Sequence, residues 1–272
     1  MEWIWGVNRI DPPVYPFRVI GFLPLFSLFL FLTLPLRAES APPTATPSNG
    51  NARAFPAWTE ACRQRVTAAA KEAQAADMTV DLLFLGDSLT ERWLKADEGL
   101  ALWERYYARH ALNFGVSADG TEHLLWRLQT IDLSSFVPTV RTVVILIGTN
   151  DSTYPPQAVV AGIDAVLARS RALFPEAKTI LVGLPRNARA DAVTQAVNET
   201  LRLRDDGKKT FYLDLPGAMT PDPAAKSWRG LGPDRLHFSS EGYRMWADLL
   251  NATLERIKKE GAEASAPAPL AK

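Results

Sequence analysis

Residues 80–93 read VDLLFLGDSLTERW, and within them an apolar run stops at a Gly-Asp-Ser turn that precedes a helix-compatible run. The run from Leu82 to Leu85 has the length and composition of a buried strand. A strand in this place delivers Ser88 to its carboxyl end, the edge where ligands bind in parallel α/β sheets. A serine at that edge can act as a nucleophile if a base reaches its hydroxyl group.

Strand and helix patterns alternate along the rest of the chain. Short apolar runs predict strands at 79–86, 111–114, 140–147, 178–184 and 210–214. Helical spacing predicts helices at 57–76, 98–108, 119–128, 156–174, 189–205 and 241–258. The strands are short and apolar, which suits a parallel sheet covered on both faces. We therefore expect an α/β fold, a three-layer α/β/α sandwich with a central parallel sheet of about five strands.

Composition and charge narrow the class of protein. The 272 residues suffice for one large α/β domain and a leader. Lys+Arg and Asp+Glu both number 30, and no basic stripe appears, so we expect no nucleic-acid partner. The single cysteine, Cys62, excludes an intrachain disulfide and lies in a helical run as a small apolar filler. No Cys/His spacing indicates a zinc site, and we expect neither a metal nor a cofactor.

The N-terminal region has the composition of a targeting segment. Residues 19–36, VIGFLPLFSLFLFLTLPL, are almost wholly apolar, and small-residue cleavage candidates follow at 36–38 and 38–40. This pattern predicts a secretory signal peptide within residues 1–37 and a secreted or periplasmic protein. An uncleaved membrane anchor through residues 19–36 is the alternative, because a bilayer span needs ~20 apolar residues.

The chain after this leader divides by composition. Residues 38–56 are rich in Ala, Pro, Thr, Ser, Asn and Gly, which predicts a disordered linker. The alternating strands and helices occupy residues 57–258, which we expect to form one catalytic domain. Residues 259–272 are predicted to be a flexible tail.

Several polar side chains follow predicted strands at the point where each strand ends. They are Ser88, the turn at 117–119, Asn150 and the Asp234/His237 loop. Because the carboxyl ends of parallel strands share one edge of the sheet, these groups can converge in space. A general base near Ser88 would make the edge a hydrolytic site.

Only three histidines are available as that base. His110 precedes a strand and therefore belongs to the opposite edge of the sheet. His123 lies in a predicted helix, where a partly buried histidine with satisfied hydrogen bonds is expected, although it can approach the site. His237 follows Asp234 by three residues, and a carboxylate so close can orient an imidazole and stabilise its protonated form. His237 is thus the predicted base.

Other groups near Ser88 have simpler or supporting roles. Asp87 is expected to cap the turn, since Asp favours turns and helix starts. The Asn150 amide is a neutral donor suited to a developing oxyanion, and backbone N–H groups of Ser88 and of the 117–119 turn can add to it. The Gly115–Asp119 segment lacks the second glycine of a G-x-S-x-G elbow, which disfavours the ordinary α/β-hydrolase fold.

Four motifs occur in order along residues 57–258: GDSL at 86–89, NFGVSAD at 113–119, GTND at 148–151 and DRLH at 234–237. Together they resemble the motifs of the SGNH, or GDSL-type, hydrolases. The stretch HALNFGVSADGTEHLLWRL at 110–128 is in particular similar to the catalytic subunits of intracellular platelet-activating factor acetylhydrolase and their bacterial relatives. The resemblance implies a flavodoxin-like SGNH hydrolase domain.

This resemblance also implies roles for individual residues. Ser88 would be the nucleophile, His237 the general base and then acid, and Asp234 its orienting carboxylate. The oxyanion hole would comprise the backbone amides of Ser88 and Ala118 and the side chain of Asn150. The family usually has glycine where this chain has Ala118. Alanine keeps the N–H donor, but its Cβ is costly if the backbone needs a positive φ there.

We therefore expect a metal-independent serine esterase that hydrolyses short-acyl esters, acetyl esters in particular, with an extracellular or envelope glycan as one plausible substrate. Two alternatives remain open. The same site could transfer the acyl group to a glycan hydroxyl, or a degenerate SGNH scaffold could serve as a binding module, a reading that Ala118 alone favours. The expected partner is a small-molecule or glycan ester, and the sequence carries no signal of oligomeric state.

Overall fold

The structure is a computed structural model that describes residues 55–265. The predicted signal peptide or anchor at 1–37 lies outside the described residues, as do almost all of the predicted linker at 38–56 and residues 266–272 of the predicted tail. No helix within the described part of the chain combines the length and apolar character needed to cross a membrane.

The centre of the domain is a five-stranded sheet in the order β2-β1-β3-β4-β5. All four strand pairings are parallel. Every residue of β1 and β3 is buried, which explains why these strands are apolar on both faces. The strands are β1 (Leu82–Gly86), β2 (Ala111–Gly115), β3 (Thr142–Leu146), β4 (Lys178–Val182) and β5 (Thr210–Leu213).

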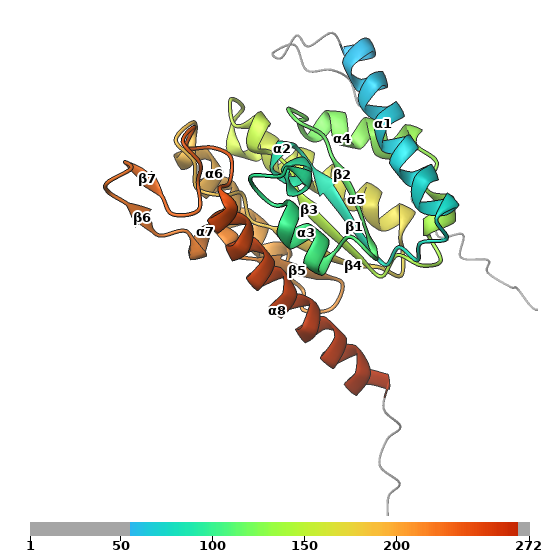
Figure 1. Ribbon diagram of the computed structural model, residues 1–272. Helices are drawn as coiled ribbons and strands as arrows, with labels where there is room; N and C mark the ends of the chain where they lie inside the picture. The colour runs from blue at the N-terminus through green and yellow to red at the C-terminus, as the bar shows by residue number, and fades with distance from the viewer. Residues whose placement is uncertain (1–54, 266–272) are drawn as a thin grey trace, which may run out of the picture. The chain divides into compact units, whose positions relative to one another are not determined.

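Helices cover both faces of this sheet, so the predicted three-layer α/β/α sandwich is confirmed (Figure 1). Helices α1, α4, α5 and α6 cover one face, and α3 and α8 cover the other. The main helices are α1 (Phe55–Ala75), α3 (Leu100–Tyr106), α4 (Thr121–Thr130), α5 (Pro156–Leu173), α6 (Asp191–Leu201) and α8 (Ser240–Ser265). Right-handed crossovers explain this division of the helices between the two faces. The connection from β1 to β2, which contains α3, runs in one direction along the sheet, and the later connections through α4, α5 and α6 run in the opposite direction.

The layer between the sheet and helices α3 and α8 is an aromatic cluster. Phe84 of β1 packs against Trp103 of α3, with ring centroids 5.1 Å apart. Trp93 lies 4.7 Å from Tyr243 and 5.1 Å from Trp246, both in α8. These rings are buried, so the cluster holds α8 against the segment that follows β1. The cluster therefore also holds α8 near the carboxyl end of β1, which Ser88 follows.

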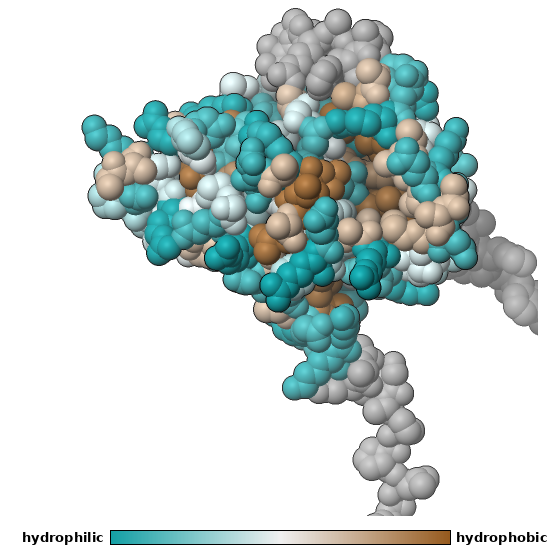
Figure 2. Space-filling view, viewed as in Figure 1, coloured by the Kyte–Doolittle hydropathy of each residue, from teal (hydrophilic) through white to brown (hydrophobic). Residues whose placement is uncertain are grey.

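Apolar side chains are otherwise concentrated in the core. Cys62 is buried there on the sheet-facing side of α1, as a small filler. Among the described residues, the exposed large hydrophobic side chains are Leu94 and Leu203. The face drawn in Figure 2 is hydrophilic around its rim, with apolar side chains gathered near its centre.

The structure differs from the predicted elements at their ends and in short segments. Helix α8 runs to Ser265, into the range expected to be a flexible tail, because residues 255–265 are mostly Glu, Lys and Ala, which favour helix. The antiparallel hairpin of β6 (Pro221–Asp222) and β7 (Ser227–Trp228) was not predicted. Short helical segments continue the helix-compatible run after the Gly-Asp-Ser turn, α2 (Ser88–Glu91) and η1 (Arg92–Leu94), and end the predicted helix at 189–205, η4 (Arg202–Arg204). Three others were not predicted: η2 (Ser134–Phe136), η3 (Thr149–Asp151) and α7 (Leu215–Ala218).

Candidate active site

Ser88 is the first residue of α2 and follows β1 at the carboxyl edge of the sheet. Asp87 caps this helix, as expected, by accepting a hydrogen bond of 2.9 Å from the Leu89 N–H. The turn before it is tight, because a Cβ on Gly86 would collide with the Thr90 side chain and the Leu146 carbonyl. The Tyr243 hydroxyl of α8 donates to the Leu89 carbonyl at 2.8 Å and fixes α2 from the other side.

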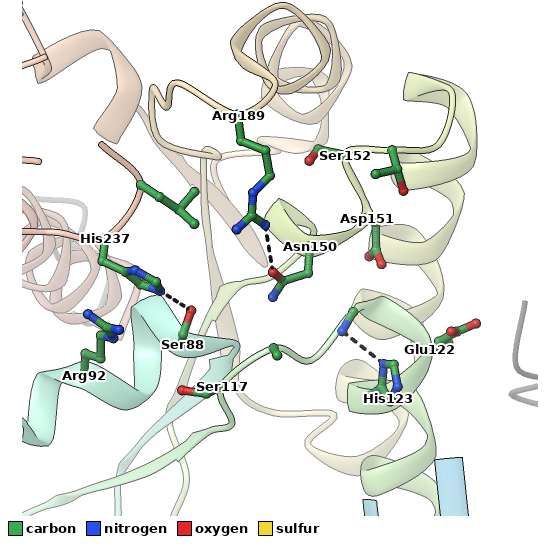
Figure 3. A pocket seen from close by; sticks show the side chains of 14 residues that line it. Ser88, Arg92, Ser117, Glu122, His123, Asn150, Asp151, Ser152, Arg189 and His237 are labelled. Carbon is green, nitrogen blue, oxygen red and sulfur yellow. Dashed lines mark hydrogen bonds between the residues drawn. The ribbon is translucent and has the colours of Figure 1, made fainter. Parts of the chain in front are cut away.

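Ser88, His237 and Asp234 lie in hydrogen-bond contact, and Figure 3 shows the contact between Ser88 and His237. Ser88 Oγ is 2.9 Å from His237 Nε2, and His237 Nδ1 is 2.6 Å from Asp234 Oδ2. An ionised carboxylate can only accept, so the Nδ1 atom carries the proton and Nε2 can accept from the serine hydroxyl. These contacts have the geometry that attack by Ser88, with His237 as base and Asp234 as its orienting carboxylate, would require.

The carboxylate of Asp234 is held in its charged form. Its partial burial would by itself raise its pKa, but hydrogen bonds from the His237 ring and from the His237 and Leu236 N–H groups lower that pKa to about 2. The stability that this carboxylate provides is present above pH 4 and is lost only as the pH falls through about 2. Asp234 is therefore an anion at any pH at which His237 could act as a base.

The turn at 117–119 and Asn150 form the opposite wall of the same cavity. Ala118 has a φ of +67°, so alanine occupies the left-handed conformation that favours glycine. The Asn150 Nδ2 group donates to the Asp119 carbonyl at 2.9 Å, and the second hydrogen of that amide can serve a ligand. The Ser117 N–H donates to Glu91 Oε2 at 2.6 Å and ties the turn to α2.

The side chain of Asp119 is anchored below this turn by a buried ion pair. Arg127 of α4 donates to Asp119 Oδ2 through Nε at 2.9 Å, and each side chain is only 1% exposed. Arg127 also donates through Nη1 to the Phe114 carbonyl at 3.0 Å. Burial raises the pKa of Asp119 above its ordinary value, and the Arg127 guanidinium partly offsets that rise. The pair joins α4 to the ends of β1 and β2.

The two remaining histidines occupy the predicted positions. His110 lies at the opposite end of the sheet, with Nδ1 2.6 Å from Asp81 Oδ1 and Nε2 3.0 Å from the Tyr106 carbonyl. His123 is buried in α4, and its Nδ1 accepts from the Gly120 N–H at 3.1 Å. Its ring reaches the far end of the cavity, away from Ser88 (Figure 3).

The cavity has a volume of about 480 Å³, and four of the five predicted site residues line it: Ser88, Ala118, Asn150 and His237. The fifth, Asp234, lies behind His237 and contacts its Nδ1 atom. Ser117 belongs to the predicted turn at 117–119, but other lining residues were not predicted from sequence: Arg92, Gly120, Glu122, Asp151, Ser152, Thr153, Arg189 and Leu236. Asp151 and Ser152 immediately follow Asn150 after a predicted strand, so their position in the sequence could have predicted that they line the cavity. Arg189 had no such signal. Within residues 55–265 no group of three His, Cys, Asp or Glu side chains is arranged to hold a metal ion.

Comparisons with known proteins agree on one family. The sequence model described as the GDSL-like lipase/acylhydrolase family matches residues 84–245. The chain is 30% identical over 207 residues to platelet-activating factor acetylhydrolase IB subunit alpha1 of Homo sapiens, covering 72% of this chain and 87% of that protein. It is 30% identical over 193 residues to the alpha2 subunit of Rattus norvegicus, covering 69% and 81%.

Solved structures share the fold at lower identity. A GDSL-like lipase of Bacteroides thetaiotaomicron aligns with a TM-score of 0.57 and 19% identity, over 71% of this chain and 98% of that chain. A lipase from a goat rumen metagenome aligns with a TM-score of 0.52 and 18% identity, over 64% and 97%. These two likenesses bear on the fold alone.

Proposed function

The chain belongs to the GDSL-like lipase/acylhydrolase family and is a carboxylic ester hydrolase, and we propose that it removes short acyl groups, acetyl in particular, through an acyl-enzyme on Ser88. The observation that carries the catalytic assignment is the Ser88 Oγ–His237 Nε2 contact of 2.9 Å, continued by the His237 Nδ1–Asp234 contact of 2.6 Å. It supports attack by a serine whose proton has an acceptor within reach.

In the proposed mechanism His237 Nε2 takes the hydroxyl proton as Ser88 Oγ attacks the ester carbonyl. Asp234 stabilises the imidazolium that forms. The N–H groups of Ser88 and Ala118 and the Asn150 amide stabilise the oxyanion. His237 then protonates the leaving alcohol, the acyl-enzyme remains, and water activated by the same imidazole releases the acid and restores Ser88.

The shape and polarity of the cavity support a short acyl group. Of its fourteen lining residues, only Ala118 and Leu236 have apolar side chains. A long acyl chain would find little apolar surface there, and each CH₂ that stays unburied forfeits about 0.8 kcal/mol. The relatives named as acetylhydrolases support the same choice.

The remainder of the cavity supports a hydroxylated leaving group. Ser117, Ser152 and Thr153 place hydroxyl groups along it, and Glu122 lies at its far end. Such groups can hydrogen-bond a sugar, so an O-acetylated glycan outside the cytoplasm is the proposed natural substrate. This substrate requires that the protein be exported, which depends on the predicted signal peptide at 1–37.

Hydrolysis of p-nitrophenyl acetate, butyrate and octanoate tests this proposal. We expect kcat/KM to fall with chain length, and Ser88→Ala to reduce turnover to background. Ser135→Ala removes an exposed hydroxyl far from the cavity and is the matched control. Faster hydrolysis of octanoate than acetate would contradict the short-acyl assignment, and wild-type turnover in Ser88→Ala would contradict the nucleophile.

Two further readouts separate the related functions. Product analysis with a glycan acceptor present distinguishes hydrolysis from acyl transfer, since transfer yields an acylated sugar in place of free acid. Labelling of Ser88 by a fluorophosphonate would exclude a pure binding module, because covalent capture needs an activated serine.

A further inference from the structure

The loop between β4 and α6, residues 185–190, is built around one buried side chain. Asn187 is 1% exposed, and its Oδ1 accepts from the N–H groups of Arg189 at 3.0 Å and Ala190 at 2.9 Å. Its Nδ2 group donates back to the Pro185 carbonyl at 3.2 Å. The backbone of Arg189 is therefore held in one conformation at the rim of the cavity.

From that rim the Arg189 side chain extends toward Asn150 (Figure 3). Its Nη1 donates to Asn150 Oδ1 at 3.3 Å. In the described part of the chain no carboxylate forms an ion pair with Arg189, whereas Arg92, the other arginine of the cavity, is paired with Glu98 at 3.0 Å. The guanidinium of Arg189 thus directs its charge at a neutral amide.

Two contacts define the orientation of that amide. The Asn150 oxygen accepts from Arg189, and the Asn150 nitrogen donates to the Asp119 carbonyl at 2.9 Å. A flipped amide would bring its NH₂ group against the guanidinium and its oxygen against a carbonyl, which loses both hydrogen bonds. Only the observed orientation keeps both hydrogen bonds and leaves the second hydrogen of the Asn150 NH₂ group for a ligand in the cavity.

We propose that Arg189 is a positioning residue for the oxyanion hole, which fixes the orientation of the Asn150 amide and polarises it as a donor. A charged donor on the amide oxygen withdraws electron density from the nitrogen and strengthens its N–H as a donor. Arg189 is exposed in the free protein, and the effect grows when an acyl group displaces water from the cavity. This inference rests on the proposed role of Asn150.

The same loop also contacts the base. The Ala188 N–H donates to the Arg235 carbonyl at 2.9 Å, within the turn that joins Asp234 to His237. The 185–190 loop therefore contacts Asn150 through Arg189 and the turn before His237 through Ala188. These two contacts connect the two walls of the cavity.

The test compares Arg189→Met, Arg189→Lys, Asn150→Ala and the Arg189→Met/Asn150→Ala double variant on p-nitrophenyl acetate, a neutral ester. Asn150→Ala is expected to lower kcat by on the order of 10²–10³. Arg189→Met should lower kcat about tenfold, as loss of an outer partner does, with KM within about twofold. Arg189→Lys keeps a charged donor and should recover part of that loss.

The double variant separates positioning from other roles. If Arg189 acts through Asn150, the double variant should be no slower than Asn150→Ala alone. Arg202→Met removes an exposed arginine outside the cavity and should match the wild type. Wild-type kcat in Arg189→Met, a loss confined to KM, or a double variant whose loss is the product of the single losses would overturn the proposal.

An NMR measurement, which needs no turnover, tests the positioning role of Arg189 independently of the proposed esterase activity. The Asn150 side-chain amide is identified in a ¹H–¹⁵N NMR spectrum by its absence in Asn150→Ala. Its signals should shift and broaden in Arg189→Met and stay unchanged in Arg202→Met. Unchanged signals in Arg189→Met would refute the positioning role even in an active enzyme. Failure of the esterase proposal would appear separately, as turnover that survives Ser88→Ala.

Discussion

Ala118 lies in the wall of the cavity in a backbone conformation that is costly for alanine. Its φ of +67° lies in the left-handed region, where a Cβ costs roughly 1–2 kcal/mol. The turn nevertheless closes, because the Asp119 N–H donates to the Val116 carbonyl at 3.2 Å. The turn thus holds alanine in a left-handed conformation at the expense of stability.

Ala118→Gly should therefore stabilise the protein by roughly 0.5–1 kcal/mol, since relief of strain exceeds the added freedom of the unfolded chain. We expect kcat to stay within about threefold of the wild type because the N–H is unchanged. Urea denaturation and p-nitrophenyl acetate kinetics measure both quantities. A lower unfolding midpoint would mean that the left-handed conformation is not held, and a kcat raised by more than tenfold would mean that the Cβ displaces the donor.

Asp87, beside Ser88, gives a pH-dependent prediction. The pKa of its carboxyl is raised to about 7, chiefly by complete burial and also by the charges of Asp119 and Asp151, while the Leu89 N–H and the charge of Arg189 oppose the rise. The unfolded chain loses this proton near pH 4 and the folded chain near pH 7. Stability should therefore fall between these values as the pH rises, by up to about 4 kcal/mol from this group.

Asp87→Asn keeps the acceptor for Leu89 and removes the ionisation, so it should be more stable than the wild type at pH 8 and similar to it near pH 4. Thermal unfolding across this range measures the difference. Asp97→Asn, at an exposed position, is the control and should leave the pH profile unchanged. Parallel wild-type and Asp87→Asn profiles would show that Asp87 ionises at its ordinary pKa.

At the scale of elements, α4 is joined to the sheet through Arg127. This side chain pairs with Asp119 and reaches the Phe114 carbonyl at the end of β2 while being 1% exposed. Removing one partner of a buried ion pair leaves an uncompensated charge in the interior, which is more costly than losing an exposed pair. The turn that carries Ala118 depends on the same contact.

Arg127→Met should accordingly destabilise the protein by about 3–5 kcal/mol. Arg204→Met supplies the matched control, since Arg204 binds Asp164 through two bonds of 2.9 and 2.7 Å but both side chains are about a third exposed. That variant should lose less than about 1 kcal/mol. Chemical denaturation of both proteins checks the difference, and equal losses would argue against burial as its cause.

At the scale of the whole molecule, the strand order determines where the site lies. The order β2-β1-β3-β4-β5 reverses direction between β1 and β3, the point at which doubly wound sheets open a crevice for ligands. Ser88 follows β1 and Asn150 lies in the segment after β3, so both border that crevice. The loop before α8 then brings His237 beside Ser88 (Figure 3), with Asp234 in contact with its ring.

The leader gives a prediction for the complete chain. If residues 1–37 direct export, cleavage after Ala38 or Ser40 should leave a protein that begins at residue 39 or 41. Expression of the full chain, followed by the intact mass of the secreted or periplasmic fraction, measures this. A full-length mass recovered with the membranes would instead support the anchor through residues 19–36.

The alternating α/β pattern, the family and the polar groups after the strands could be predicted from short stretches of sequence such as GDSL and DRLH. The remaining features depend on how distant segments pack together. The contact between Ser88 and His237 joins residues 149 positions apart, and its distance depends on the strand order. The same holds for the positive φ of Ala118, the burial of Asp87 and the contact of Arg189 with Asn150. Backbone conformation, desolvation and side-chain reach arise from packing among distant segments, which no local pattern encodes.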